Sequence, residues 1–168
     1  ATYDFTDLTS FLAVYYPAMQ VLQTAQDFED LAWEYLRRAH EQGVVHVEMF
    51  FDPQAHTSRG VPFADVIGGY RRATVRAQRE LALSAELIMC FLRDFSAEYA
   101  MATLMEALPY KEWILAVGLD SDERGNPPSK FAEVFARARK EGFLLTMHCD
   151  IDQPGSIEHI RQVIEDIG

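Results

Sequence analysis

The segment Gly142–Asp152, GFLLTMHCDID, joins an apolar run to side chains that can bind a metal or transfer a proton. His148 follows the apolar residues directly, and Asp150 and Asp152 come shortly after it. Imidazole is the commonest zinc ligand in proteins, and a carboxylate beside a bound water can act as a general acid or base. Catalytic zinc typically uses three protein ligands, and the sequence contains no HxH pair. The segment therefore predicts either part of a metal site or a surface loop.

Polar side chains follow three other apolar runs in the same way. Asp52 follows the first run, Arg93 and Asp94 the second, and Asp120 the third. Such short runs without alternation are typical of parallel strands covered on both faces. In parallel α/β folds the carboxyl ends of the strands carry the site, so we expect these groups at one rim. The four runs, including the one before His148, are Val44–Phe51, Leu87–Leu92, Trp113–Leu119 and Phe143–Met147.

The loop Leu119–Pro128, LDSDERGNPP, leaves the third run with several charged residues. Asp120 and Ser121 lie directly at the strand tip, where they are well placed to touch a ligand. Ser121 can offer a backbone N–H and a hydroxyl to the edge of a polar heterocycle. We interpret the next three residues, 122–124, as a solvated turn before a capped helix.

The remaining histidines have ordinary structural explanations. His56 and Arg59 lie in a long loop after the first run, and His56 has no partner at helical spacing, so we interpret it as structural. His40 and His46 are structural or exposed by the same reasoning. His159 falls on the polar side of the last helical pattern, and we expect it to be exposed.

Helical periodicity fills the gaps between the four runs. Apolar stripes recur at three- and four-residue spacing, with Asp27 as the expected N-cap of the first helix and Ser156 of the last. Alternating helices and strands predict a parallel sheet with right-handed crossovers. The sheet is either a small doubly wound one or about half of a barrel, since a complete barrel needs ~250 residues. The residues alone leave these two folds open. The patterns cover 28–39, 63–81, 131–138 and 157–167, with a weaker one at 95–107.

Composition excludes several classes of partner. The 168 residues include 26 acidic and 15 basic ones, a net charge of −11, which argues against nucleic acid or an anionic membrane. Cys90 and Cys149 indicate reduced thiols rather than a disulfide framework. No apolar run reaches the length of a membrane span, so we expect a soluble cytoplasmic protein.

Four segments together resemble a known family. FLAVYY (11–16), VHVEMFFDPQAHTSRGV (45–61), VGLDSDERGNPPSKFAEVFARARKEGF (117–143) and TMHCDIDQPGSIEHI (146–160) follow the order and spacing of the adenosine/adenine deaminase family. The FFDPQ-HT-RG and GLDS-E-GNPP-KF forms resemble its adenine deaminase-like branch. The resemblance covers nearly the whole chain.

The resemblance implies a fold and a division of the barrel. The family is a (β/α)8 TIM barrel of the metal-dependent hydrolase superfamily, and residues 1–168 would be strands two to five with their helices. This would be one partial catalytic-barrel domain without an internal boundary. The family's HxH metal pair would lie before Ala1, and its later metal-binding strands beyond Gly168. The remaining barrel half would belong to the same protein, and the 168-residue piece alone is expected to be inactive.

The resemblance also implies a reaction and its residues. A divalent metal, usually Zn²⁺, activates water that attacks C6 of a 6-aminopurine such as adenine or adenosine, and ammonia leaves. His148 corresponds to the family's third metal histidine, and Ser121, beside Asp120, to a residue whose backbone N–H meets N3 of the purine. The apolar helix that covers the family's pocket corresponds to Phe11, Leu12 and Tyr15, although their spacing equally suits ordinary packing.

The general acid departs from the family pattern. The family has a glutamate three residues after the metal histidine, where this chain has Ile151. One inserted residue would put Asp152 in that place, and Asp150 is the other catalytic candidate. One alternative to the enzyme is therefore a non-catalytic purine-binding relative that lost the acid. The other, which sets the resemblance aside, is a four-stranded doubly wound receiver-like domain whose acidic rim binds a divalent ion. A homo-oligomer is compatible with the sequence.

Overall fold

The computed structural model describes residues 4–150 and 153–168. Four parallel strands form one sheet in the order β1-β2-β3-β4. They are β1 (His46–Phe51), β2 (Ser84–Leu92), β3 (Ala116–Asp120) and β4 (Leu144–Leu145). All four predicted runs therefore contribute a strand, and the parallel arrangement is confirmed.

The helices lie before, between and after the strands. The chain between each strand and the next one contains helix and returns to the start of the next strand. The helical elements are α1 (Leu8–Ala18), η1 (Met19–Val21), α2 (Ala25–Glu41), α3 (Gln54–Thr57), α4 (Phe63–Leu81), α5 (Ala97–Ala107), η2 (Leu108–Trp113), η3 (Pro128–Phe131), α6 (Ala132–Glu141), α7 (Ser156–Arg161) and η4 (Gln162–Ile167). In the described part of the chain, no helix is both long and apolar enough to cross a membrane.

The start of α2 differs from the prediction. Thr24, not Asp27, is the N-cap, and Asp27 is the third residue of the helix. The Thr24 side chain accepts a hydrogen bond from the Asp27 N–H, and the Asp27 carboxylate accepts one from the Thr24 N–H at 2.8 Å. This capping box satisfies two N–H groups that helix geometry leaves without a partner. At the last helix, Gly155 rather than Ser156 occupies the cap position.

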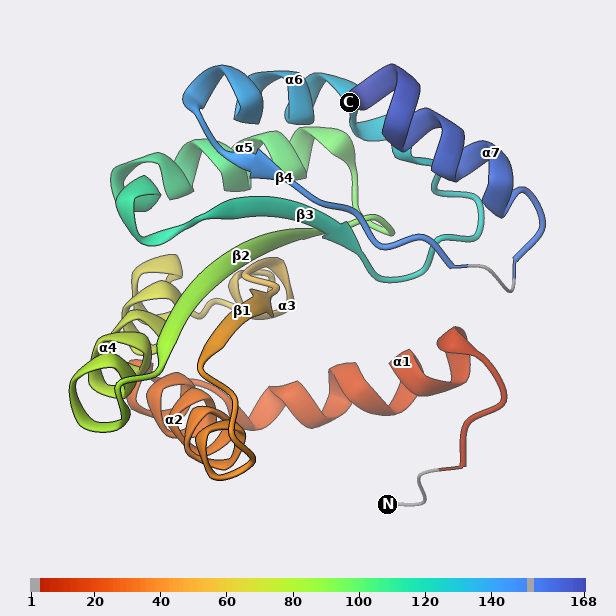
Figure 1. The fold of residues 1–168 in the computed structure, drawn as a ribbon. Helices are drawn as coiled ribbons and strands as arrows, with labels where there is room; N and C mark the ends of the chain where they lie inside the picture. Colours follow the sequence, from red (N-terminus) through yellow and green to blue (C-terminus); the bar gives the residue numbers. More distant parts are fainter. Residues whose placement is uncertain (1–3, 151–152) are drawn as a thin grey trace.

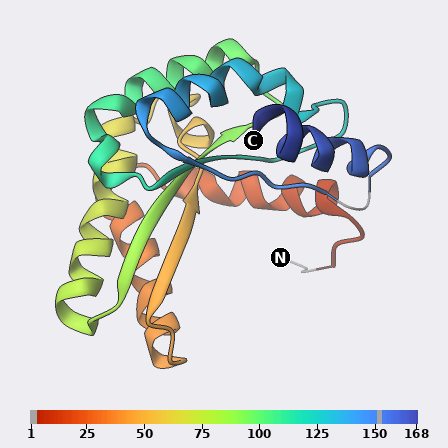
Figure 2. The same cartoon turned by 45° about the horizontal axis from the view of Figure 1, so that its top comes forward.

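The order of the strands decides between the two predicted folds. In a doubly wound sheet the strand order reverses at a switch point, whereas here each strand pairs with the next one along the chain. Right-handed crossovers in one direction place the connecting helices on one side of the sheet. Figures 1 and 2 show α2, α4, α5 and α6 following one another around that outer side. The doubly wound alternative is therefore wrong, and the sheet is an arc of a singly wound barrel.

The core lies between this arc and the outer helices. Its largest cluster contains buried aromatic residues from β1, β2, α2, α4 and α6 with their neighbours, among them Phe28, Phe51, Phe63, Phe91 and Phe135. Strand β2 is buried along most of its length, as predicted for a covered parallel strand. Strand β1 instead alternates between buried and exposed residues, because one of its faces is left uncovered here.

Strand β4 is short, but its pairing continues toward the predicted site. The N–H of Thr146 donates to the carbonyl of Val117 at 3.0 Å, and the N–H of His148 donates to that of Leu119 at 2.8 Å. The backbone of His148 is therefore fixed beside the end of β3. These bonds bring the fourth strand's polar end next to Asp120.

Candidate active site

A cavity of about 290 Å³ lies at the carboxyl ends of the strands. Residues of helix α1 line one side of it, and Figure 1 shows α1 on the other side of the sheet from α5 and α6. The structure thus brings together Asp52, from the end of β1, with six of the residues predicted from the sequence. The lining residues are Leu8, Phe11, Leu12, Tyr15, Tyr16, Phe50, Asp52, Asp120, Ser121 and His148.

Two carboxyl groups lie close together in the lining of the cavity. The side chains of Asp52 and Asp120, together with the thiol of Cys90, offer ligand atoms that lie within 4.8 Å of one another. Burial raises the pKa of Asp52. Burial also raises the pKa of Asp120 well above its ordinary value, and the neighbouring Asp52 carboxylate adds to that rise. Because two like charges this close disfavour double ionisation, the pair tends to retain one proton.

Ser121 has an unusual backbone conformation at the edge of the cavity. Its φ is +75°, in the left-handed region that a non-glycine residue rarely adopts. Its side chain is buried, and it follows β3 directly. Such conformations cost of order 1–3 kcal/mol and cluster at functional sites. This conformation was not predicted from the sequence.

Helix α1 contributes an aromatic wall. Its Asp7 N-cap and Ser10 form a capping box that fixes the start of the helix. Phe11 and Tyr15 stack with ring centroids 5.4 Å apart. Burial raises the pKa of Tyr15 to about 12, and it also raises the pKa of Tyr16. Both phenols therefore stay neutral near pH 7 and can donate hydrogen bonds into a cavity lined by carboxyl groups.

The donor set fits a divalent cation in part. His148 supplies the imidazole that zinc favours, and it lines the same cavity as the two carboxyl groups. Asp52 Oδ1 and Asp120 Oδ1 are buried without a hydrogen-bond partner in the described ranges, so both are available as acceptors. Within residues 4–150 and 153–168, however, the tight ligand grouping is Asp52, Cys90 and Asp120, without His148. His148 lines the same cavity but lies outside this grouping.

Of the two candidates for the general acid, Asp150 lies within the described residues and Asp152 does not. Asp150 lies on the segment after β4, and its backbone N–H donates to Glu123 Oε2 at 2.5 Å. It is not among the residues that line the cavity. Asp152 lies outside the described residues.

Glu123 and His159 were both predicted to be exposed to solvent, and in the structure both side chains are largely or completely buried. Glu123 is completely buried rather than part of a solvated turn, and it forms an ion pair with Arg93, which is also completely buried. The His159 side chain is only 12% exposed, and its Nδ1 lies 2.6 Å from Glu123 Oε1. Both predictions are wrong because Glu123 points inward from its loop and pairs with groups distant in the sequence. The flanking residues Asp122 and Arg124 do lie near the surface, as predicted for a solvated turn, and they form an ion pair with each other.

His56 and Arg59 have the structural role predicted for the histidine. The His56 side chain is buried, and Arg59 Nη2 donates to its Nδ1 at 2.9 Å. Arg59 also donates to the backbone carbonyls of Met19 and Leu22, so it ties the α3 loop to the chain before α2. Burial lowers the pKa of His56 to about 4, and the Arg59 charge contributes.

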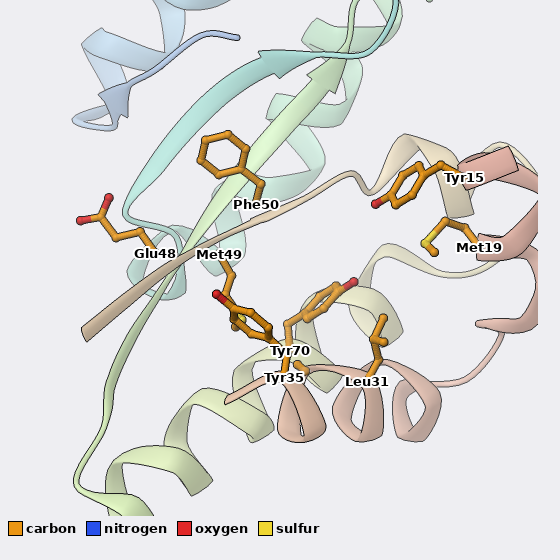
Figure 3. Close-up of a pocket in the computed structure, with 9 residues that line it drawn as sticks. Tyr15, Met19, Leu31, Tyr35, Glu48, Met49, Phe50 and Tyr70 are labelled. Carbon is orange, nitrogen blue, oxygen red and sulfur yellow. The ribbon is translucent and has the colours of Figure 1, made fainter. Parts of the chain in front are cut away.

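A second cavity, of about 550 Å³, lies between β1, α1, α2 and α4 (Figure 3). Figure 3 shows Tyr35, Met49 and Tyr70 gathered on its lower side, and its lining is mostly apolar. Strand β1 is an edge of the sheet, and Phe50 beside this cavity is 52% exposed. An edge strand leaves its outer row of backbone N–H and C=O groups available for pairing with a further strand.

Comparison with known proteins identifies the family. A sequence profile described as adenosine deaminase matches residues 1–168, the entire chain. The chain belongs to the adenosine deaminase family. Among individual relatives, the adenine deaminase of Geotalea uraniireducens is 53% identical over 165 residues, covering 98% of this chain and 46% of that protein.

Solved structures support the family and the barrel. The crystal structure of adenine deaminase from Arthrobacter aurescens superposes with a TM-score of 0.93 at 42% identity, covering 98% of this chain and 50% of that one. An amidohydrolase from Burkholderia ambifaria, solved with bound Zn, shares the fold with a TM-score of 0.81 at 24% identity, covering 87% and 40%. This member of the deaminase family therefore spans about half the length of the relatives it matches, and its four strands form about half of a TIM barrel.

Proposed function

We propose that this chain is part of a metal-dependent enzyme that hydrolytically deaminates a 6-aminopurine of the adenine or adenosine type. Water adds at C6, ammonia leaves, and the 6-oxopurine is the product. The observation that carries the proposal is the cavity at the strand ends that Asp52, Asp120, Ser121 and His148 line together with the aromatic residues of α1. Membership of the adenosine deaminase family and the names of the relatives support it.

We assign His148 to the metal. A divalent cation such as Zn²⁺, when bound, lowers the pKa of water toward ~7 and so supplies hydroxide at neutral pH. His148 would be one ligand, and the others would come from barrel strands outside residues 1–168, which together with this part would form one barrel domain. The isolated 168-residue chain would then be inactive.

The other cavity residues bind and orient the purine. The Ser121 backbone N–H would meet the N3 edge of the ring, next to Asp120. Phe11, Leu12 and Tyr15 would cover the ring and exclude water, which strengthens each electrostatic contact inside. Asp52 and Asp120 would retain one proton between them and face the polar edge of the purine.

The general acid is proposed to be an aspartate of the segment after β4. Asp152 or Asp150 would protonate ring N1 as water adds at C6. Because an aspartate is one methylene shorter than the glutamate of the family pattern, the backbone there would have to approach the purine more closely. This requirement makes the placement of the segment 148–153 important for the reaction.

The same sequence difference supports a second candidate. With Ile151 at the family's acid position, the protein would bind a purine without releasing ammonia. Ile151→Glu would restore some turnover in that case. The two candidates share the cavity and differ only in chemistry.

A spectrophotometric assay separates them. The full-length, metal-loaded protein is incubated with adenine, adenosine and N6-methyladenine, while loss of the 6-aminopurine absorbance and release of ammonia or methylamine are recorded. Turnover of at least one of these purines supports the enzyme. Calorimetric binding without turnover supports the non-catalytic relative, and absence of both binding and turnover contradicts both.

A further inference from the structure

A completely buried ion pair lies against the backbone of two residues that line the active-site cavity, Asp120 and His148. Arg93 Nη1 and Glu123 Oε2 are 3.1 Å apart, and both side chains have no exposed surface. Burial lowers the pKa of Arg93, and the Glu123 charge opposes that shift. Removing two charges from water is costly, and a buried pair is often no more stabilising than apolar residues of the same volume. Stability alone is therefore a weak explanation for this pair.

The guanidinium of Arg93 connects two segments that form the cavity. Its Nη1 donates to the backbone carbonyl of His148 at 2.8 Å, and its Nε donates to that of Asn126 at 3.0 Å. The backbone N–H of Arg93 also donates to the carbonyl of Asp120 at 3.1 Å. One residue at the end of β2 thus joins the ends of β3 and β4 and the loop after β3.

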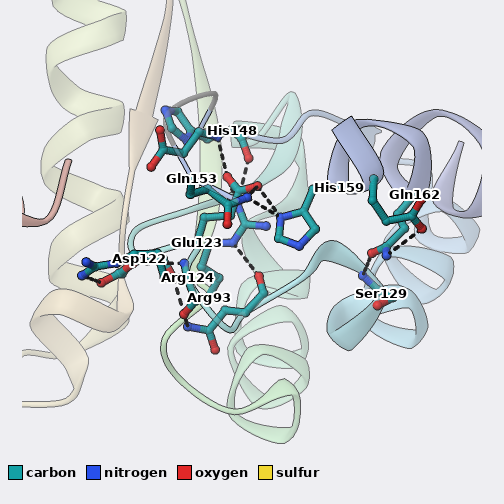
Figure 4. A network of polar contacts seen from close by, with 12 residues as sticks. Arg93, Asp122, Glu123, Arg124, Ser129, His148, Gln153, His159 and Gln162 are labelled. Atoms are coloured by element: carbon teal, nitrogen blue, oxygen red, sulfur yellow. Dashed lines mark hydrogen bonds and ion pairs between the residues drawn. The ribbon is translucent and has the colours of Figure 1, made fainter. Parts of the chain in front are cut away.

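The carboxylate of Glu123 holds the segment after His148 from both ends. Oε2 accepts from the backbone N–H of Asp150 at 2.5 Å, and Oε1 accepts from Gln153 Nε2 at 3.2 Å. His159, on α7, contacts the same Oε1. Figure 4 shows Glu123 between Arg93, Gln153 and His159, with His148 on the adjoining segment. Glu123 therefore contacts Asp150, one of the two aspartates proposed as the general acid, whereas Asp152 lies outside the described residues.

We propose that Glu123 and Arg93 are positioning residues of the active site. The pair holds the backbone at His148 and at Asp150 and also binds the side chain of Gln153, so that the metal-binding imidazole and the acid face the purine. The proposal deepens the deaminase function proposed above and rests on it for the catalytic consequence. The fixing of the segment is testable without any substrate.

The experiment compares two neighbouring acids in the full-length protein. Glu123→Gln keeps the shape but removes the charge, and Asp122→Asn is the matched control, because Asp122 pairs with Arg124 within its own loop. Amide hydrogen exchange is measured on peptides covering residues 146–155, and kcat and KM are measured with the best 6-aminopurine. Loss of such outer contacts typically costs about 10–100-fold in activity or metal affinity.

We expect Glu123→Gln to raise exchange in residues 146–155 by at least ~10-fold and to lower kcat by ~10–100-fold, with KM changed less than ~3-fold. The Asp122→Asn variant should match the wild type in both measurements. Unchanged exchange in Glu123→Gln would overturn the proposal. The proposal would also be overturned if Glu123→Gln lowered kcat no more than Asp122→Asn does.

A double variant separates positioning from simple stability. Arg93→Met with Glu123→Met removes both buried charges and should fold even if Glu123→Gln does not. Positioning predicts that it regains thermal stability while exchange in residues 146–155 stays high and kcat stays low. Recovery of kcat together with stability would show a purely structural pair. If the wild type deaminates no purine, the proposed function fails, and the exchange comparison alone decides the role of Glu123.

Discussion

Replacing either of two adjacent glycines of α4, Gly68 and Gly69, by alanine should change the stability of the protein in opposite directions. A glycine inside a helix costs about 1 kcal/mol relative to alanine, so Gly68 and Gly69 both weaken α4 unless something requires them. At Gly68, an added Cβ would find only Arg72 Nη1, 3.9 Å away. At Gly69 it would lie 2.6 Å from Phe28 Cβ and would also collide with the backbone carbonyl oxygen of Ala25. Helices α2 and α4 therefore cross in contact at Gly69.

The size of the effect follows from these contacts. Gly68→Ala should raise the free energy of unfolding by about 1 kcal/mol through helix propensity alone. Gly69→Ala gains the same ~1 kcal/mol from helix propensity. Its new Cβ, however, collides with backbone and with the Cβ of the buried Phe28, and neither of these can rotate away. Overpacking of this kind costs ~3 kcal/mol or more, so the net loss should be at least ~2 kcal/mol. The two variants should thus differ by ~3 kcal/mol.

Denaturant unfolding of the full-length protein measures this difference. Gly68→Ala should shift the midpoint to higher urea concentration and Gly69→Ala to lower, with similar slopes. Equal stability of the two variants would show that α2 and α4 do not approach each other as closely as described. That result would also mean that β1 and β2, which these helices cover, pack differently from the arrangement described.

Other expectations concern pH and packing. Because the folded-state pKa of His56 is about 4, below the ordinary value of 6.5, the fold favours its neutral form, and its contribution to stability is lost as the pH falls from ~6.5 through 4. Unfolding free energy should drop by up to ~3 kcal/mol over that range, and a His56→Gln variant with the same pH slope would contradict this. A Cβ on Gly118 would lie 2.5 Å from Cys90 Sγ, so Gly118→Ala should destabilise by ~1–3 kcal/mol. In a double-mutant cycle, Cys90→Ala should recover at least ~1 kcal/mol of that loss, and additive effects would refute the contact.

The convergence of Asp52, Asp120 and His148 could be predicted from the sequence. All three follow short apolar runs, and parallel strands present their carboxyl ends at one edge. The rule needs only the order of the elements, and the cavity that these residues line agrees with it. Whether the strands wind in one direction or two could not be predicted from the periodicity, because both arrangements use the same helices and strands.

The role of Glu123 could not be predicted in this way. Its partners Arg93 and His159 lie about thirty residues away on either side, so local sequence shows only an acidic turn. An arginine immediately after a buried strand was a usable signal, since a buried guanidinium requires a carboxylate nearby. The N-cap at Thr24 also had a signal, the T-x-x-D spacing of a capping box.

The proposed role of His148 is to bind the metal that drives deamination in this cavity. The most direct measurement is the metal content and the rate of 6-aminopurine turnover in the same preparation of full-length wild type and His148→Gln. We expect one tightly bound divalent ion per wild-type site, with metal affinity at least ~10-fold weaker and turnover at least ~100-fold lower in the variant. A His148→Gln protein that keeps both its metal and its wild-type rate would contradict the account.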